Sequence, residues 1–332
     1  MSASAPPPEG HAPGLGEDAA RRQDGSPAGT GKEDGLQTGR VVAAHGRHYA
    51  VELDGGGVRQ CYPRGKKAGA AAVGDRVRIR PQGRDEGAIE AVLPRANLLY
   101  RSDEMRTKQF AANVDLLIVV VAVRPQFSDD LLGRALAGAW AAGVQPLIVL
   151  NKVDLADGLD AARRRLAPVA RLGVPVLELS ALDGAAVHAA LAERLAGRTS
   201  LLLGQSGMGK STLLNALAPQ AQAATREHSE ALGTGRHTTT STRLYHLPPP
   251  GGDLIDSPGF QAFGLQHLTP GDIERGFPEF AGPARLCRFY NCTHRHEPGC
   301  GVLAALQAGD IDPSRHALYE RLLQEHEAAQ RY

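Results

Sequence analysis

The chain has 332 residues, of which 42% are hydrophobic and 22% charged, so it can form one to three globular domains with a sizeable core. It has no run of about 18 apolar residues and no basic N-terminal segment followed by an apolar stretch, so we expect neither a membrane span nor a secretory signal. The net charge of +1 is unevenly distributed along the chain. Residues 38–101 form a basic region with twelve basic and six acidic residues. A basic module indicates a nucleic-acid partner, and a solvated charged surface explains it about equally well.

Two segments precede the part of the chain with helical periodicity. Residues 1–37 are rich in Gly, Pro, Ala and acidic residues and almost lack large apolar side chains, so we expect a disordered tail. Residues 38–100 contain five short runs of strand character separated by turn clusters, which predicts a β-barrel of the OB type, with other small barrels left open. The five runs are Arg40–Ala44, His48–Leu53, Gly57–Tyr62, Arg76–Arg80 and Ala88–Val92.

Residues 101–268 carry the pattern of a doubly wound α/β domain. Strands alternate with helices, and the loops after the strands carry polar residues, which places a site at the carboxyl ends of a parallel sheet. The expected strands are Val114–Val123, Pro146–Leu150, Val174–Leu179 and Thr199–Leu203, and the expected helices are Asp129–Ala142, Leu159–Leu172 and Gly184–Leu195. Residues 269–332 differ again, with short helices around a Cys/His cluster and an amphipathic helix from Pro313, capped by Asp312.

The loop after Thr199–Leu203 matches the phosphate-binding P-loop pattern GxxxxGK[ST] in full. Its residues are Gly204, Gln205, Ser206, Gly207, Met208, Gly209, Lys210 and Ser211, followed by Thr212. Glycines at these positions allow backbone N–H groups to surround a β-phosphate at the start of the following helix. Lys210 is expected to bridge the β- and γ-phosphates and to act in catalysis, and the Ser211 hydroxyl is expected to ligate Mg²⁺.

A second motif predicts recognition of guanine. It consists of Asn151, Lys152, Val153 and Asp154. Asp154 can accept from N1–H and the N2 amine of guanine, a donor pair that adenine does not present. After the next strand, Ser180 and Ala181 are placed to direct a backbone N–H at O6 of the base. In an ordinary GTPase the P-loop comes first, whereas here it follows the guanine motif by about fifty residues, which predicts a circularly permuted P-loop GTPase domain.

Two segments after the P-loop resemble nucleotide switches. Asp256-Ser257-Pro258-Gly259 fits the DxxG pattern, in which Asp256 holds Mg²⁺ through water and the Gly259 N–H contacts the γ-phosphate, with a plain turn as the alternative. Within residues 235–240, Thr239 is expected to ligate Mg²⁺ and assist catalysis, and Thr240 is the alternative. The permutation joins the DxxG switch directly to the C-terminal region. We therefore expect the presence or absence of the γ-phosphate to affect the position of that region.

The catalytic side chain is less clearly defined. Phe260 stands where many GTPases carry a water-orienting glutamine, and an apolar side chain cannot orient water. Either His237 or a bound partner is then expected to complete the site, with slow turnover in the absence of that partner. His237 as a solvated loop residue is an equally good interpretation.

The C-terminal region contains a metal-binding pattern. Cys287, Cys292, His294 and Cys300 form C-x4-C-x-H-x5-C. Three thiolates and one imidazole complete a tetrahedral set with no open position, which predicts one structural Zn²⁺. His296 is a weaker candidate ligand, and Cys61, far away in the sequence, is expected to be a packed thiol.

These features together resemble the family of bacterial ribosome small subunit-dependent GTPase A. The resemblance rests on the basic barrel, the permuted motif order, GRHTTT at residues 235–240, DSPGF at residues 256–260 and the Cys/His tail, and it covers residues 38–332. It implies a GTP hydrolase that binds GTP and GDP, acts late in the maturation of the small ribosomal subunit, and is stimulated by that subunit. It also implies that the OB and zinc domains bind ribosomal RNA, and we expect a cytoplasmic monomer.

Two other functions remain open at this point. A P-loop ATPase or small-molecule kinase requires the Asn151–Asp154 match to be accidental. A passive RNA-binding assembly module requires a vestigial nucleotide site, and intact Lys210, Ser211 and Asp256 argue against it.

Overall fold

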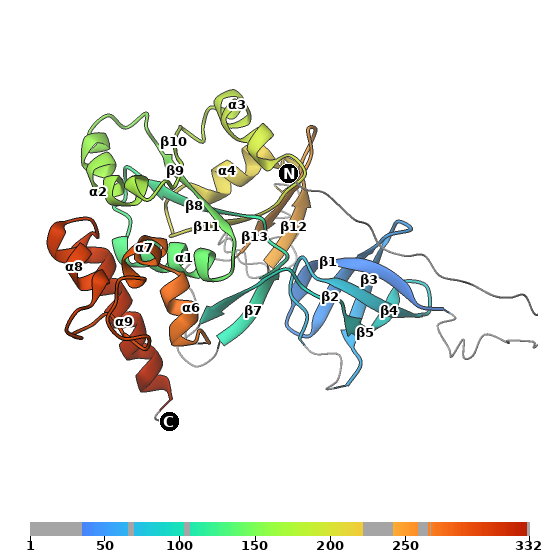
Figure 1. Ribbon diagram of the computed structural model, residues 1–332. Coiled ribbons are helices and arrows are strands. Elements are labelled where there is room, and N and C mark those ends of the chain that lie inside the picture. Colours follow the sequence, from blue (N-terminus) through green and yellow to red (C-terminus); the bar gives the residue numbers. More distant parts are fainter. Residues whose placement is uncertain are drawn as a thin grey trace, which may run out of the picture. The chain divides into compact units, whose positions relative to one another are not determined.

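The computed structural model describes residues 35–65, 70–102, 107–221, 242–257, 265 and 267–330. The chain divides into residues 1–34 and residues 35–332, and the description that follows concerns the second of these units. Figure 1 labels its elements.

The first five strands close into a barrel. They are β1 (Gln37–His45), β2 (His48–Leu53), β3 (Val58–Pro63), β4 (Arg76–Gln82) and β5 (Glu86–Val92). The strand order is β1-β2-β3-β5-β4, and β4 pairs again with β1. This is the closed five-stranded topology of the OB fold, so the predicted barrel type is confirmed. Alternate residues point inward, and the interior includes Val41, Val51, Val77, Ile79 and Ile89, none of which is exposed.

A six-stranded sheet forms the centre of the nucleotide domain. Its strands are β8 (Leu116–Ala122), β9 (Gln145–Asn151), β10 (Val176–Glu178), β11 (Thr199–Gly204), β12 (Thr242–His246) and β13 (Asp253–Asp256). In the order β10-β9-β8-β11-β13-β12, all neighbours are parallel except β12, which is antiparallel to β13. Strand β11, which delivers the P-loop, therefore lies between β8 and β13, with every residue buried.

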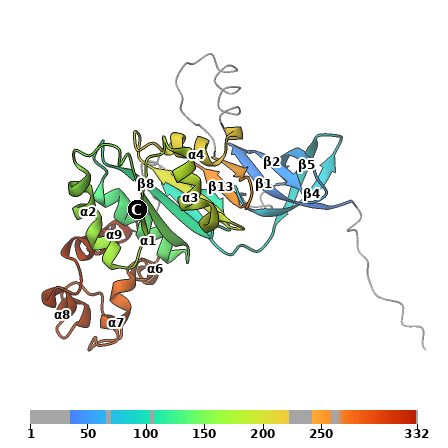
Figure 2. The ribbon, with the colours of Figure 1, turned by 90° about the horizontal axis from the view of Figure 1, so that it is seen from above.

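Helices pack on both faces of this sheet. They are α1 (Asp129–Ala141), α2 (Leu159–Arg171), α3 (Gly184–Leu195) and α4 (Lys210–Leu217). The right-handed rule for crossover connections puts α1 and α2 on one face and α3 and α4 on the other, and α3 packs beside α4 (Figure 2). The strands that carry the guanine motif, the P-loop and the DxxG motif come in this order along the chain, and all three lie in the parallel part of one sheet. The predicted circular permutation is therefore confirmed.

Two pairings were not predicted from the sequence. Strands β6 (Leu98–Ser102) and β7 (Thr107–Ala112) form a separate two-stranded sheet after the barrel. Strand β12 pairs antiparallel with β1 of the barrel, through Ala43 with Arg243 and Ala44 with Thr242. As a consequence, barrel and nucleotide domain share one hydrogen-bonded sheet.

The C-terminal region is helical, as predicted. Its elements are α6 (Pro270–Arg275), the 3-10 helix η2 (Pro278–Phe280), α7 (Ala281–Ala284), α8 (Gly301–Ala308) and α9 (Pro313–Ala329). Asp312 caps α9, since its Oδ1 accepts from the Ser314 amide at 3.0 Å. The core of this region is aromatic: the ring of Phe280 lies 5.3 Å from that of Phe277 and 5.0 Å from that of Tyr319.

Candidate nucleotide-binding site

The P-loop has the backbone conformation that its glycines permit. Gly204 ends β11, and α4 begins at Lys210 after Gly209, whose φ is +89°. Gly207 also has a positive φ of +81°. A Cβ atom at Gly209 would overlap Nδ2 of Asn151, so only glycine fits at that position. The loop thereby opens the N-terminus of α4 for an anion.

Asn151 connects three loops of the site. It ends β9, is 1% exposed, and its Nδ2 donates to the carbonyl oxygen of Met208 in the P-loop at 2.8 Å. Its Oδ1 accepts from the amides of Lys152 and Ala181, each at 2.8 Å. The expected contact of a backbone N–H of Ser180 or Ala181 with guanine O6 stays a prediction, and in this structure the Ala181 amide donates to Asn151.

The Lys152 side chain links the guanine motif to the P-loop by hydrogen bonds. Its Nζ donates to the carbonyl of Gly207 at 2.7 Å and to that of Arg124 at 2.9 Å. Its backbone φ of +62° lies in the left-handed region, which turns the chain sharply after β9. Two residues on, Asp154 is exposed, so its carboxylate is accessible to a base.

The side of the site where Mg²⁺ is predicted to bind is built from β13 and α4. Asp256 ends β13, is 1% exposed, and forms an ion pair with Lys210. Burial raises the pKa of the Asp256 carboxyl, and Lys210 offsets part of that shift. Ser211 and Thr212 follow Lys210 and are exposed. The structure thus brings the P-loop and Asp256 together at the carboxyl ends of β11 and β13, next to the guanine motif.

Several predicted site residues lie outside the described residues. They are His237, Thr239, Thr240, Gly259 and Phe260. Their roles stay predictions.

One contact of the site, between the P-loop and the residue that precedes α1, was not predicted from the sequence. The Gln205 side chain accepts from the Ser128 amide at 2.7 Å through its Oε1. Ser128 carries a sequence signal as the N-cap of α1, since it precedes Asp129 and Asp130, but nothing in the sequence pairs it with a residue 77 positions away.

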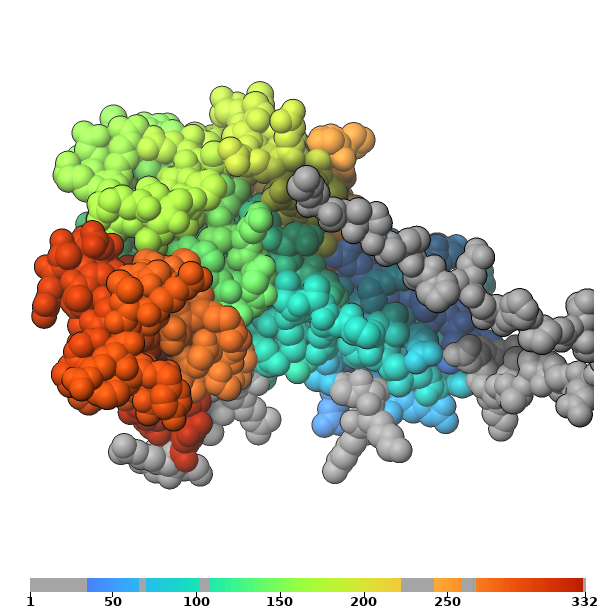
Figure 3. Space-filling model, in the orientation of Figure 1, coloured from blue at the N-terminus to red at the C-terminus, as the bar shows by residue number. Residues whose placement is uncertain are grey.

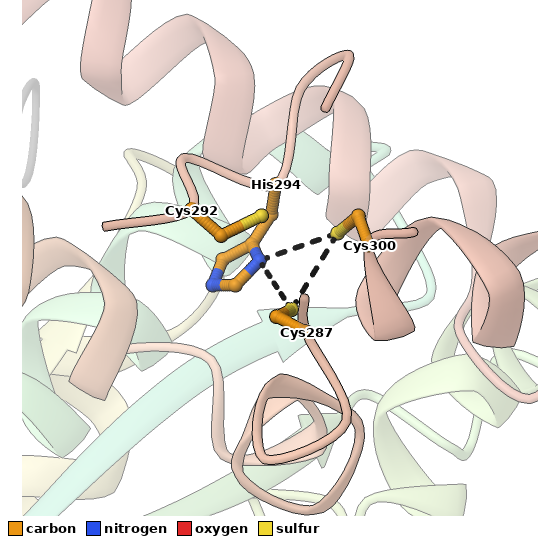
Figure 4. Close-up of side chains that lie close together, drawn as sticks. All are labelled: Cys287, Cys292, His294 and Cys300. Atoms are coloured by element: carbon orange, nitrogen blue, oxygen red, sulfur yellow. Dashed lines mark hydrogen bonds between the residues drawn. The ribbon is translucent and has the colours of Figure 1, made fainter. Parts of the chain in front are cut away.

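The four predicted metal ligands converge in the C-terminal region. Their ligand atoms all lie within 4.8 Å of one another, and the Nδ1 of His294 points at two of the sulfurs (Figure 4). The sulfurs of Cys287 and Cys300 are 3.8 Å apart, and Nδ1 lies 3.5 Å and 3.4 Å from them. A tetrahedron with metal–sulfur bonds of about 2.3 Å has edges of about 3.8 Å, so the donor set fits a metal ion.

The other cysteine behaves as expected of a packed thiol. Cys61 is fully buried in β3, and burial raises the pKa of its thiol to about 11. Among the described residues, no helix is long and apolar enough to cross a membrane.

Comparison with known proteins gives one consistent result. The model of the RsgA GTPase family matches residues 92–266. The chain is 76% identical over 294 residues to the small ribosomal subunit biogenesis GTPase RsgA of Bordetella pertussis, covering 89% of this chain and 98% of the relative. It is 57% identical over 315 residues to the protein of the same name from Burkholderia pseudomallei, covering 94% and 98%.

Solved structures agree with this result. YjeQ from Thermotoga maritima is 32% identical, with a TM-score of 0.65 over 88% of this chain and 98% of that one. YloQ, described as a circularly permuted GTPase, is 26% identical, with a TM-score of 0.64 over 90% and 98%. The chain therefore belongs to the RsgA GTPase family and is a GTPase.

Proposed function

We propose that this GTPase acts in late maturation of the small ribosomal subunit, binding the subunit and its ribosomal RNA as a monomer and hydrolysing GTP in response. The observation that carries the proposal is 76% identity to a protein named as a small ribosomal subunit biogenesis GTPase, over 98% of that protein's length. The basic barrel supports an RNA partner, because a cluster of cationic side chains attracts the phosphate backbone.

Each predicted residue has a role in the proposed reaction. Asp154 selects guanine, and the amides from Gly207 to Ser211 hold the phosphates. Lys210 neutralises charge that develops between the β- and γ-phosphates. Ser211 and Asp256 would hold Mg²⁺, with Thr239 as the third candidate; the ion supplies charge stabilisation on the phosphate oxygens when bound. The Gly259 amide and His237 complete the proposal, as γ-phosphate contact and as the group that orients water.

We also propose that the ion held by the four C-terminal ligands is zinc. Three thiolates with one imidazole favour Zn²⁺ over harder cations, which prefer oxygen ligands. The Nε2 of His294 lies 3.6 Å from a carboxylate oxygen of Glu274, and a carboxylate beside the second ring nitrogen orients a ligating histidine. Elemental analysis of purified protein should find about one zinc per chain, and its absence after expression in zinc-supplemented medium would contradict the assignment.

The proposed function is tested by stimulation of GTP hydrolysis. Purified small subunits should raise the hydrolysis rate by about tenfold or more, as partners that complete GTPase sites do, and isolated large subunits should not. The Lys210→Ala variant serves as the control for contaminating GTPases. Equal rates with both subunits would show that the protein does not act on the small subunit.

A further inference from the structure

The connection between β8 and α1 follows the surface of the P-loop. Gln205 Oε1 accepts from the Ser128 amide at 2.7 Å. A Cβ at Gly207 would lie 3.3 Å from the ring of Pro125, and Lys152 bonds the carbonyls of both Arg124 and Gly207. These contacts join the P-loop to the segment that precedes α1.

Helix α1 is a rigid element between the P-loop and the C-terminal region. Ser128 caps it through an Oγ that accepts from the Leu131 amide at 3.2 Å. Most of the helix from Leu132 to Ala139 is buried. Because packed interiors resist continuous deformation, a shift at the capped end moves the helix as a body.

The first two turns of α1 also contact α9. Arg134, whose side chain is 16% exposed, donates to both carboxylate oxygens of Glu325 at 2.6 Å and 2.8 Å. Arg321 returns a bond to Asp130 at 2.6 Å. Gly133 lets Leu318 of α9 lie directly on the α1 backbone. The C-terminal elements and the nucleotide domain adjoin in the space-filling view (Figure 3).

Helix α9 in turn holds the metal-binding loop. The His316 Nε2 bonds to the carbonyl oxygen of His294 at 2.7 Å, and the Tyr319 hydroxyl donates to that of Thr293 at 3.2 Å. An unbroken set of contacts therefore runs from the P-loop through α1 and α9 to the metal ligands.

We propose that α1 couples nucleotide occupancy to the C-terminal region, and that Gln205 is the positioning residue that links α1 to the P-loop. The inference rests on the proposed GTP site but not on the DxxG switch, whose connection to α6 is a separate route. Reciprocity requires that the C-terminal region bias nucleotide affinity by the same factor.

The protein contains its own reporter for this coupling. Its single tryptophan, Trp140, lies near the end of α1, and the Arg315 guanidinium of α9 lies 5.2 Å from the centre of its ring. Tryptophan emission should therefore respond when α1 and α9 shift relative to each other. The measurement uses the full chain with its metal and without ribosomal subunits, so it does not depend on the proposed partner.

The experiment compares emission at full occupancy by a non-hydrolysable GTP analogue and by GDP, with occupancy measured separately by equilibrium dialysis. Wild-type emission should differ between the two states. Gln205→Met, which removes the acceptor, should reduce that difference at least about fivefold, and Gln205→Glu, which keeps an acceptor, should restore most of it. Glu325→Gln, which weakens the contact of α9 with Arg134 of α1, should change the ratio of analogue to GDP affinity, and Gln324→Ala, at an exposed position of α9, should not.

The outcomes separate the two proposals. Bound nucleotide without any difference in wild-type emission, or an unchanged difference in Gln205→Met, overturns the coupling and leaves the GTPase function intact. Failure of both nucleotides to bind in dialysis overturns both.

Discussion

At the scale of single residues, Asp154 offers the clearest test of base recognition. Asp154→Asn removes the acceptor for N1–H and the N2 amine of guanine, and charged hydrogen bonds of this kind contribute about 1.5–3 kcal/mol, so GTP and GDP affinity should fall by about 10- to 100-fold. Xanthosine triphosphate, which has a carbonyl at C2, should gain affinity because the new amide can donate to it. Isothermal titration with the three nucleotides measures both changes. Unchanged GTP affinity would show that the motif match is accidental.

Asn151 has a larger structural role than the guanine motif indicates. Its side chain bonds to Met208, Lys152 and Ala181 while 1% exposed, so Asn151→Ala leaves buried polar groups without partners. We expect a loss of about 1–3 kcal/mol, seen as a lower melting temperature even without nucleotide. Asp154→Asn, on the exposed side of the loop, is the matched control and should melt close to wild type. Equal melting temperatures for all three proteins would argue against this role.

Only part of the arrangement around Asn151 can be predicted from the sequence. The alternation of strands and helices predicted that Asn151 and the P-loop lie at the same edge of the sheet, because the carboxyl ends of parallel strands meet there. The overlap of Asn151 with a Cβ at Gly209 and the bond from Gln205 to Ser128 could not be predicted, since both depend on distances between loops that no local pattern encodes.

At the scale of secondary-structure elements, the sequence predicts the strands that have a clear apolar pattern but not those that are defined by their pairing partners. Strand β8 is a continuous apolar run, which predicts a buried strand, whereas β12 has five residues that mix polar and apolar side chains. Its place in the sheet is set by pairing with β13 and β1, which no local pattern encodes.

The junction of β1, β12 and β13 carries a titratable cluster. His246 of β12 bonds to Asp253 at 2.7 Å and to Glu52 of the barrel at 2.9 Å, and Arg40 forms an ion pair with the same Asp253. Two carboxylates on the two ring nitrogens require the doubly protonated imidazole. Burial opposes that charged form, but Asp253 and Glu52 outweigh it, so the pKa of His246 is raised.

This cluster predicts a pH dependence of stability. A raised folded-state pKa gives stabilisation that is complete below the unfolded value of about 6.5 and is lost as the pH rises through the folded value. The His246 side chain is 57% exposed, so solvent screening limits the effect to about 1 kcal/mol or less. In denaturant unfolding, His246→Gln should lower stability at about pH 6 and have little effect at about pH 9. An equal loss at both pH values would exclude the charged imidazole as the cause.

At the scale of the whole molecule, the charge distribution bears on the proposed binding of RNA. Residues 38–101 carry a net charge of +6, but several of the arginines are already paired within the barrel. Arg76 makes two bonds of 2.6 Å to Asp54, and Arg64 and Arg80 share Glu90. Arg47 and Arg84 lie in turns of the barrel, after β1 and after β4, and both are exposed. These two side chains are therefore better placed to displace counterions from a phosphate backbone than the paired ones.

The salt dependence of the proposed binding to small-subunit RNA tests this difference between the exposed arginines and those in ion pairs. Each phosphate contact contributes about 0.7 to 0.9 to the slope of log affinity against log salt, so the Arg47→Gln, Arg84→Gln double variant should reduce the slope by about 1.5. Arg76→Gln removes one charge too, but Asp54 already neutralises it, so its slope should stay near that of wild type even if the barrel is less stable. Filter binding between about 50 and 200 mM salt resolves the two cases. If Arg76→Gln lowered the slope as much as each exposed position does, RNA would contact the face of Arg76 and Asp54, and the ion pair would have to open for binding.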